Sequence, residues 1–96
     1  MNPQARYQRS PNIYQRRLGG ESLLVPVKGN LADMQKAFSL NASGDVLWAA
    51  LAQPCSREDL RGELVAAFQV DEETADRDVT IFLDHLLERG LVEHLK

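Results

Sequence analysis

The side chains best suited to catalysis or metal binding in this sequence are one cysteine and two histidines. No two of Cys55, His85 and His94 have the short spacing of a metal site, such as C-x-x-C or H-x-x-x-H. Cys55 follows Pro54 in a predicted helix connection, and only Arg57 is close enough in sequence to activate its thiol. We therefore expect no catalytic residue, no metal and no cofactor, and a structural or surface role for His85.

The acidic residues are the other group that could carry chemistry. They fall on the polar sides of predicted amphipathic helices, a pattern typical of a solvated face. Gly19-Gly20 is not a phosphate-binding loop, because no Lys-Ser/Thr pair follows it. Helix capping explains the glycosylation sequon at Asn41-Ala42-Ser43. No residue pattern supports an enzyme.

Length and composition fit one small domain. The chain has 96 residues, of which 44% are hydrophobic, and this is enough for a single core. No stretch reaches the roughly 18–20 apolar residues of a membrane span, and residues 1–12 lack the apolar core of a signal peptide. A single cysteine cannot form an internal disulfide, so we expect a reducing, cytoplasmic setting.

Charge divides the chain into a basic start and an acidic remainder. The first twenty residues contain four arginines and no acid, whereas the rest contain seven Lys/Arg and fourteen Asp/Glu. An acidic body is poorly suited to nucleic acid, where neutralising phosphates supplies most of the affinity. Residues 1–12 are polar and contain two prolines, so we predict a flexible arm there and a folded domain over residues 13–96.

A β-hairpin is predicted at the start of the folded part. Residues 13–18 and 21–27 have the composition of strands, and Gly19-Gly20 between them supplies the positive φ angles of a two-residue turn. Pro26 has no N–H group to donate. This end of the second strand should therefore lie at a sheet edge or a bulge.

A short third strand is predicted after a connection of less certain type. Residues 28–30 indicate a turn, and residues 31–35 fit either a helical turn or a longer loop. Residues 36–40 alternate in polarity, which places Phe38 and Leu40 on one face of the strand.

Three helices follow the strands. Asn41, Ser56 and Asp71 are predicted N-caps, while Pro54 ends the first helix and Gly90 ends the third. Apolar residues at helical spacing predict the buried faces, which comprise Val46, Leu47, Ala50 and Leu51, then Leu60, Leu64, Val65 and Phe68, then Ala75, Val79, Phe82, Leu83, Leu86 and Leu87. A last extended segment is expected at residues 91–92. This order predicts an α+β, winged-helix-like fold, with a three-stranded antiparallel sheet followed by a three-helix bundle.

Two surface features point to binding. The third predicted strand could leave one edge unpaired, and an exposed edge can accept an extended peptide as an added strand. On the third helix, Ile81 falls outside the apolar stripe, beside Asp78 and His85. If the open edge faces this helix, these three side chains line one wall of a groove.

A family resemblance accompanies these features. The stretch from Leu40 to Leu51, L-N-A-S-G-D-V-L-W-A-A-L, resembles the signature L-N-x-(S/T)-(A/G)-x-x-(I/L)-W-x-x-L of the PqqD family, named for a protein of pyrroloquinoline quinone biosynthesis. The resemblance covers about residues 14–95. It continues through Ser56 to Leu60, Leu64, Phe68, Val70-Asp71, Asp78-Val79, Phe82-Leu83, Leu86 and Gly90 to Val92.

The resemblance implies a RiPP recognition element, a domain that binds the leader segment of a ribosomally made precursor peptide. The leader would add as a strand beside the third strand, against the third helix. It would then be presented to a modifying enzyme such as a radical S-adenosylmethionine protein, a leader peptidase or a cyclase. The implied peptide-binding residues are Lys36, Ala37, Phe38, Ser39 and Leu40 on the strand and Asp78, Ile81, Phe82 and His85 on the helix.

Two other interpretations stay open. A winged-helix DNA-binding regulator would use the third helix for recognition, but Asp71 to Glu88 contains seven acids against one arginine and would repel phosphates. A dimerisation or adaptor module would bind no peptide at all. A homodimer formed through the open strand edge is compatible with either binding interpretation.

Overall fold

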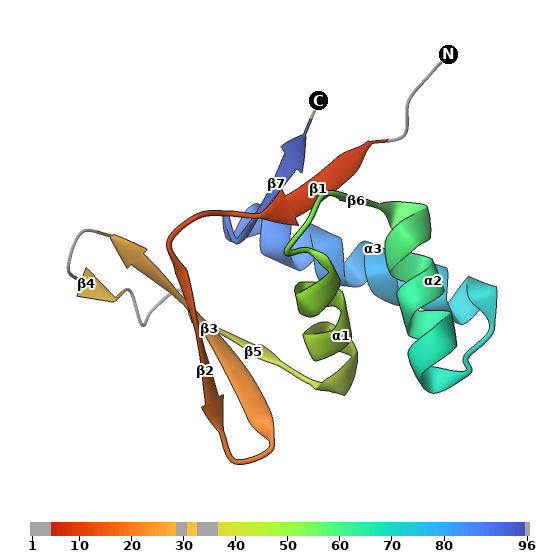
Figure 1. The fold of residues 1–96 in the computed structure, drawn as a ribbon, viewed down its shortest axis with the longest axis horizontal. Helices are drawn as coiled ribbons and strands as arrows, with labels where there is room; N and C mark the ends of the chain where they lie inside the picture. The colour runs from red at the N-terminus through yellow and green to blue at the C-terminus, as the bar shows by residue number, and fades with distance from the viewer. Residues whose placement is uncertain (1–4, 29–30, 33–36, 96) are drawn as a thin grey trace.

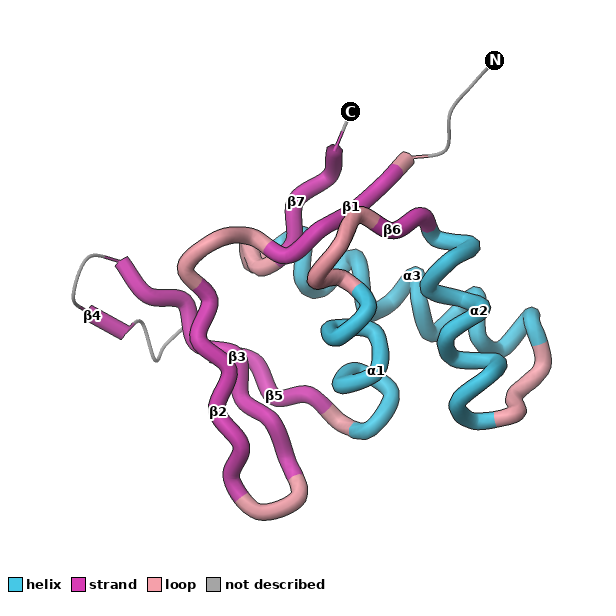
Figure 2. Tube along the Cα trace, in the orientation of Figure 1, coloured by secondary structure: helices cyan, strands magenta, loops and turns pink. Residues whose placement is uncertain are grey.

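The computed structural model describes residues 5–28, 31–32 and 37–95 (Figure 1). The elements are, in chain order, β1 Arg6–Arg9, β2 Ile13–Leu18, β3 Glu21–Lys28, β4 Leu31–Ala32, β5 Phe38–Leu40, α1 Ala42–Ala50, β6 Cys55–Ser56, α2 Arg57–Phe68, α3 Glu72–Glu88 and β7 Val92–Leu95. The helices gather in one group, with the β2–β3 hairpin and β5 on one side and the β1–β7 pair at one end (Figure 2). The predicted α+β class is confirmed. None of the helices in the described part is both long and apolar enough to cross a membrane.

The predicted hairpin forms the larger sheet. β3 pairs antiparallel with β2 on one side, and with β5 and β4 at different positions along its other side. A φ of +63° at Gly19 allows the two-residue connection between paired Leu18 and Glu21. Leu31–Ala32 forms β4, where a helical turn or a loop was predicted. This strand pairs with the end of β3 that extends beyond β5 and so satisfies backbone groups there.

A second sheet, in the order β6-β1-β7, joins the two ends of the described chain. Arg6–Arg9 of β1 pairs antiparallel with Val92–Leu95 of β7, and its first two residues also pair with Cys55–Ser56 of β6. The prediction of a flexible arm is therefore wrong for these four residues, while residues 1–4 lie outside the described part. Arg6–Arg9 is a polar segment without an apolar period. It is ordered by pairing with strands far away in the sequence.

β1 is also tied to the helices by side chains. Tyr7 is 9% exposed and belongs to the core. The Arg9 Nε donates a hydrogen bond to the Trp48 carbonyl oxygen at 2.9 Å, and the Arg9 guanidinium lies 4.7 Å from the centroid of the Trp48 ring. The Arg9 amide also donates to the Leu51 carbonyl oxygen. β1 therefore closes over α1 as well as pairing with β7.

The three predicted N-caps are confirmed. The Asn41 Oδ1 accepts a hydrogen bond from the Gly44 amide at 2.8 Å at the start of α1. Ser56 and Asp59 form a capping box at the start of α2, in which each side chain accepts a hydrogen bond from the other's amide at 3.0 Å. Asp71 caps α3 by accepting from the amide of Thr74, the third residue of the helix. Hydrogen bonding from the Thr74 side chain, and then from its amide, lowers the pKa of the Asp71 carboxyl.

One core lies between the helices and the two sheets. Its buried members are Tyr7, Leu24, Leu40, Leu47, Trp48, Leu51, Cys55, Leu60, Leu64, Ala75, Val79, Leu83, Leu86, Leu91 and Val92. Most of the predicted helix faces are therefore in the core or packed against it. Phe68 differs from the prediction, because it is the last residue of α2 and is 39% exposed.

Removing the capping hydroxyl of α2 should destabilise the domain measurably. Ser56 is only 4% exposed, so solvent cannot readily replace the hydrogen bond that its Oγ accepts. We expect Ser56→Ala to lower the free energy of unfolding by about 1–2 kcal/mol. Urea unfolding followed by circular dichroism measures this loss. Ser56→Thr keeps the hydroxyl and should lose much less, so equal losses in the two variants would contradict the capping role.

Candidate functional site

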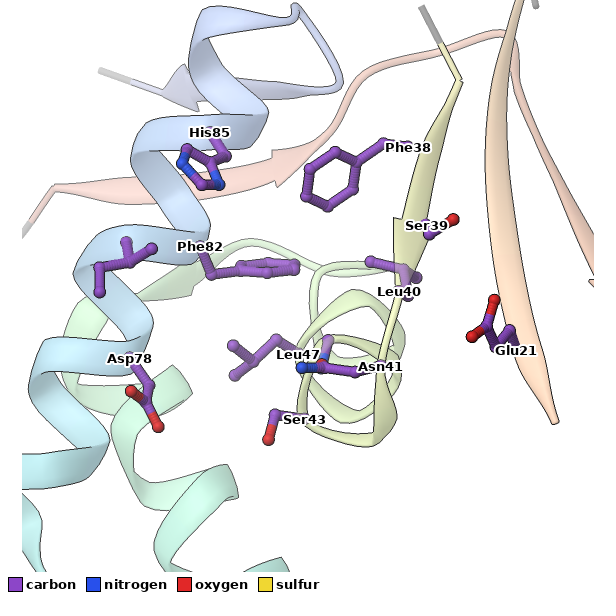
Figure 3. Close-up of a pocket in the computed structure, with 12 residues that line it drawn as sticks. Glu21, Phe38, Ser39, Leu40, Asn41, Ser43, Leu47, Asp78, Phe82 and His85 are labelled. Carbon is purple, nitrogen blue, oxygen red and sulfur yellow. The ribbon is translucent and has the colours of Figure 1, made fainter.

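A groove of about 400 Å³ lies between β5 and α3 (Figure 3). The side chains of β5 stand on one wall and those of α3 on the other, while the start of α1 lies at the base. The lining residues are Glu21, Phe38, Ser39, Leu40, Asn41, Ser43, Gly44, Leu47, Asp78, Ile81, Phe82 and His85.

The hydrogen-bond register of the hairpin shows which way the backbone of β3 faces. The Val27 amide donates to the Asn12 carbonyl oxygen at 2.8 Å, so these two residues form a hydrogen-bonded pair at the end of the β2–β3 ladder. Such pairs alternate with non-hydrogen-bonded pairs along an antiparallel ladder. The backbone groups of Ser22 and Leu24 therefore face away from β2 and toward β5.

The same alternation defines the open edge of β5. Phe38 pairs with Leu24 and Leu40 pairs with Ser22, so the backbone groups of Phe38 and Leu40 face β3. The N–H and C=O groups of Ala37 and Ser39 face the opposite edge. Among the described residues, no strand pairs with β5 on that side. The edge thus presents unused backbone donors and acceptors beside the groove.

The groove is apolar in its middle. Phe38 and Phe82 are partly buried against the core, and Leu40 and Leu47 are fully enclosed. The Phe38 ring meets the His85 ring in an edge-on contact, with centroids 6.2 Å apart. Ile81 is 49% exposed, and it is the exposed large apolar side chain that borders the groove. An extended ligand in the groove would cover this exposed apolar surface.

The start of α1 lies close against β5 because residue 44 is glycine. A Cβ atom at Gly44 would stand 3.0 Å from the Leu40 Cδ2 atom, a tight contact that would force the Leu40 side chain to shift. The Asn41 cap fixes the first turn of the same helix at this point. Asn41 and Gly44 therefore place the base of the groove through capping and close packing.

Charged side chains stand toward the two ends of the groove. Glu21 follows the turn of the hairpin, one position beyond the Ser22–Leu40 pair, and Asp78 stands near the start of the α3 wall (Figure 3). At the other end, the guanidinium of Arg89 lies 5.2 Å from the centroid of the Phe38 ring. The groove thus has carboxylates at one end and an apolar middle, and the guanidinium of Arg89 lies beside its other end.

The structure brings most of the predicted binding residues together. Seven of them line the groove, namely Phe38, Ser39, Leu40, Asp78, Ile81, Phe82 and His85. Ala37 precedes β5 and is not among the lining residues, while Lys36 lies outside the described part of the chain. That these residues bind peptide stays a prediction.

Five lining residues were not predicted to belong to the site. Asn41, Ser43, Gly44 and Leu47 occur in the stretch that resembles the family signature, where capping and core packing account for them. Glu21 carries no local signal. It reaches the groove only because the hairpin register places it opposite the end of β5.

The described residues offer little for catalysis. They contain no group of three or more His, Cys, Asp or Glu side chains that could hold a metal ion. The Cys55 Sγ donates a hydrogen bond to the Ala50 carbonyl oxygen at 3.1 Å. Burial raises the pKa of this thiol, and the nearby carboxylates of Asp59 and Glu63 raise it further. Cys55 is therefore a buried, protonated thiol rather than a nucleophile.

Comparison with known proteins yields one family match and one structural match. The family model for coenzyme PQQ synthesis protein D matches residues 21–92 of this chain. The solved structure described as "TbiB1 in Complex with the TbiA(beta) Leader Peptide" aligns with a TM-score of 0.71. The two sequences are 24% identical, and the alignment covers 90% of this chain and 94% of that one. No curated protein sequence matches the chain.

Proposed function

Because this chain belongs to the PqqD family, whose members are non-catalytic binding domains, we propose that it binds the leader segment of a ribosomally made precursor peptide. The observation that carries the proposal is the open edge of β5. The unused backbone groups of Ala37 and Ser39 lie beside an apolar groove bordered by the exposed Ile81.

An extended peptide satisfies both features of the groove at once. Its backbone continues the β3–β5 ladder by exchanging hydrogen bonds with Ala37 and Ser39. Its alternate side chains point toward α3 and cover Ile81 and Phe82, as in any pleated strand. Hydrogen bonding provides an attachment that is independent of peptide sequence, and the groove provides preference for apolar side chains.

The structural match supports a leader as the ligand. TbiB1 has the same fold and is named as a complex with a leader peptide. Because the members of this family are non-catalytic binding domains, chemical modification of the peptide would take place on another protein. We infer that the domain presents the bound leader to a modifying enzyme, such as a radical S-adenosylmethionine protein, a leader peptidase or a cyclase.

The structure gives a DNA-binding role no support. α3 carries six acidic side chains and the Asp71 cap against one arginine, Arg77. A second copy of the chain could occupy the open edge instead of a peptide, since any strand with free backbone groups can add there. Light scattering with and without peptide separates these cases. A peptide-bound monomer supports the proposal, whereas a dimer that leaves no edge for peptide contradicts it.

Blocking the open edge of β5 should weaken peptide binding without breaking the sheet. Ala37→Pro removes an N–H group that faces away from β3, so the β3–β5 ladder keeps its hydrogen bonds. We expect isothermal titration with a synthetic leader peptide, encoded by a precursor gene beside this one, to give a Kd between micromolar and nanomolar. Ala37→Pro should raise that Kd about tenfold, corresponding to one lost hydrogen bond.

Ala37→Val is the matched control, because it changes the side chain at the same position and keeps the N–H group. Its Kd should stay within about twofold of the wild-type value. Unchanged binding by Ala37→Pro, in protein with the wild-type circular dichroism spectrum, would exclude strand addition at β5.

A further inference from the structure

The charges at the two ends of the groove have no ion-pair partner among residues 5–28, 31–32 and 37–95. In the described part of the chain, the ion pairs join Arg17 to Asp45 and Arg61 to Glu58 and Asp76, and none involves Glu21, Asp78 or Arg89. Arg17 is the described cation nearest to Glu21 in the hairpin register, yet it stands 3.6 Å from Asp45 instead. Glu21 and Asp78 are therefore available to a ligand at one end, and Arg89 at the other.

Helix dipoles act against this polarity, but they are weaker. The start of α1 lies at the acidic end and contributes roughly half a positive charge, against the two carboxylates of Glu21 and Asp78. The end of α3 contributes roughly half a negative charge near Arg89. Its last carbonyls already accept hydrogen bonds, including those from the Gly90 and Leu91 amides. The full charges of the side chains therefore set the sign of the electrostatic potential at each end of the groove.

The spacing of these charges can be expressed in residues of an extended peptide. His85 follows Asp78 by seven positions on α3, and Arg89, the C-cap of this helix, follows it by eleven. These separations correspond to about 10 and 16 Å along the helix axis. A strand advances about 3.3 Å per residue. Two charges on a bound peptide would meet the two ends of the groove if they stood roughly three to five residues apart.

The direction of the peptide then sets the order of the charges. β5 runs from Phe38, beside His85 and Arg89, to Leu40, beside the acidic end. Every strand pair in the described structure is antiparallel, and antiparallel pairs are the more common kind. A peptide added antiparallel to β5 enters at the acidic end and leaves at the basic end.

We propose that the groove selects leader segments in which a basic residue precedes an acidic residue by about three to five positions, with apolar residues between them. The basic side chain would lie between Glu21 and Asp78, and the acidic side chain near Arg89. This inference rests on the proposed function, since it specifies the peptide that the same groove binds.

Three versions of the leader peptide test the charge order. They share one apolar segment and differ only at two positions four residues apart, which hold Lys then Glu, Glu then Lys, or Gln at both. We expect the Lys-then-Glu peptide to bind about tenfold more tightly than the Glu-then-Lys peptide, with the Gln peptide between them. Reversing the order replaces two exposed attractions by two repulsions, and each of these contributes roughly twofold in affinity. The difference should shrink in high salt.

A charge exchange on α3 provides the decisive variant. Asp78→Lys combined with Arg89→Glu should reverse the preference, so that the Glu-then-Lys peptide binds more tightly. Arg77→Glu combined with Asp84→Lys is the matched control, because it exchanges the same two kinds of charge at exposed positions of the same helix, whereas Asp78 lines the groove and Arg89 contacts its Phe38 ring. The control should keep the wild-type order.

The possible failures are distinguishable. Equal binding of all three peptides, or tighter binding of the Glu-then-Lys peptide by the wild-type protein, overturns the charge rule and leaves the proposed function standing. No binding by any of the three overturns both.

Discussion

Replacing Ile81 by glutamate is expected to reduce leader-peptide binding by roughly 30- to 150-fold. The Ile81 side chain is 49% exposed on the wall of the groove, so a bound peptide would bury its remaining apolar surface. Losing the burial of the exposed half of this side chain costs about 1 kcal/mol, and dehydrating a carboxylate in the groove adds about 1–2 kcal/mol. Isothermal titration with the leader peptide measures the change in Kd.

Two controls isolate the groove in this experiment. Ile81→Val keeps an apolar side chain and should lose less than about tenfold in affinity. Tyr14→Glu places the same charge on another exposed large side chain, in β2 and outside the groove lining, and should not change the Kd. Equal Kd values for Ile81→Glu and the wild type would rule out docking against α3.

Replacing Trp48 by alanine is expected to have the largest effect on stability, with a loss of about 3–5 kcal/mol in the free energy of unfolding. Trp48 is 2% exposed and is the largest fully buried side chain in the described chain. Its ring also supports the guanidinium of Arg9, so the substitution both opens a cavity and loosens the contact that holds β1 on α1. Because small domains have a total stability of about 5–15 kcal/mol, the variant should be close to unfolding.

Urea unfolding at equilibrium measures this loss. Trp48→Phe keeps an aromatic ring over which the Arg9 guanidinium can lie. We expect its loss in the free energy of unfolding to be less than half of the loss in Trp48→Ala. A loss below about 1 kcal/mol in Trp48→Ala would contradict the central place of this side chain in the core.

The elements that depend on local chemistry were predictable from the sequence. Asn41, Ser56 and Asp71 cap the three helices because each side chain reaches an amide only three residues away. Gly19 closes the hairpin because a two-residue turn needs a positive φ angle. The exposure of Ile81 follows equally from helical periodicity, since it lies outside the apolar stripe of α3.

The candidate site was only partly predictable. The open edge of β5 and the α3 wall were expected from patterns within each element, and seven predicted residues do line one groove. Glu21 was missed because its position depends on the register of β3 against both β2 and β5. The sequence also did not predict that the carboxylates of Glu21 and Asp78 and the guanidinium of Arg89 lie toward opposite ends of the groove. This arrangement depends on the strand register and on the contact between Arg89 and Phe38.

The sequence by itself therefore determined where the helices begin and which helix residue presents exposed apolar surface. Those properties arise from side chains a few positions apart. Only the tertiary structure decided that Arg6–Arg9 is a strand instead of a flexible arm, and that Glu21 shares a groove with Asp78. β1 pairs with a segment at the opposite end of the chain. The folded backbone brings these two segments within hydrogen-bonding distance. The pattern of residues within a short polar segment cannot predict such a distant partner.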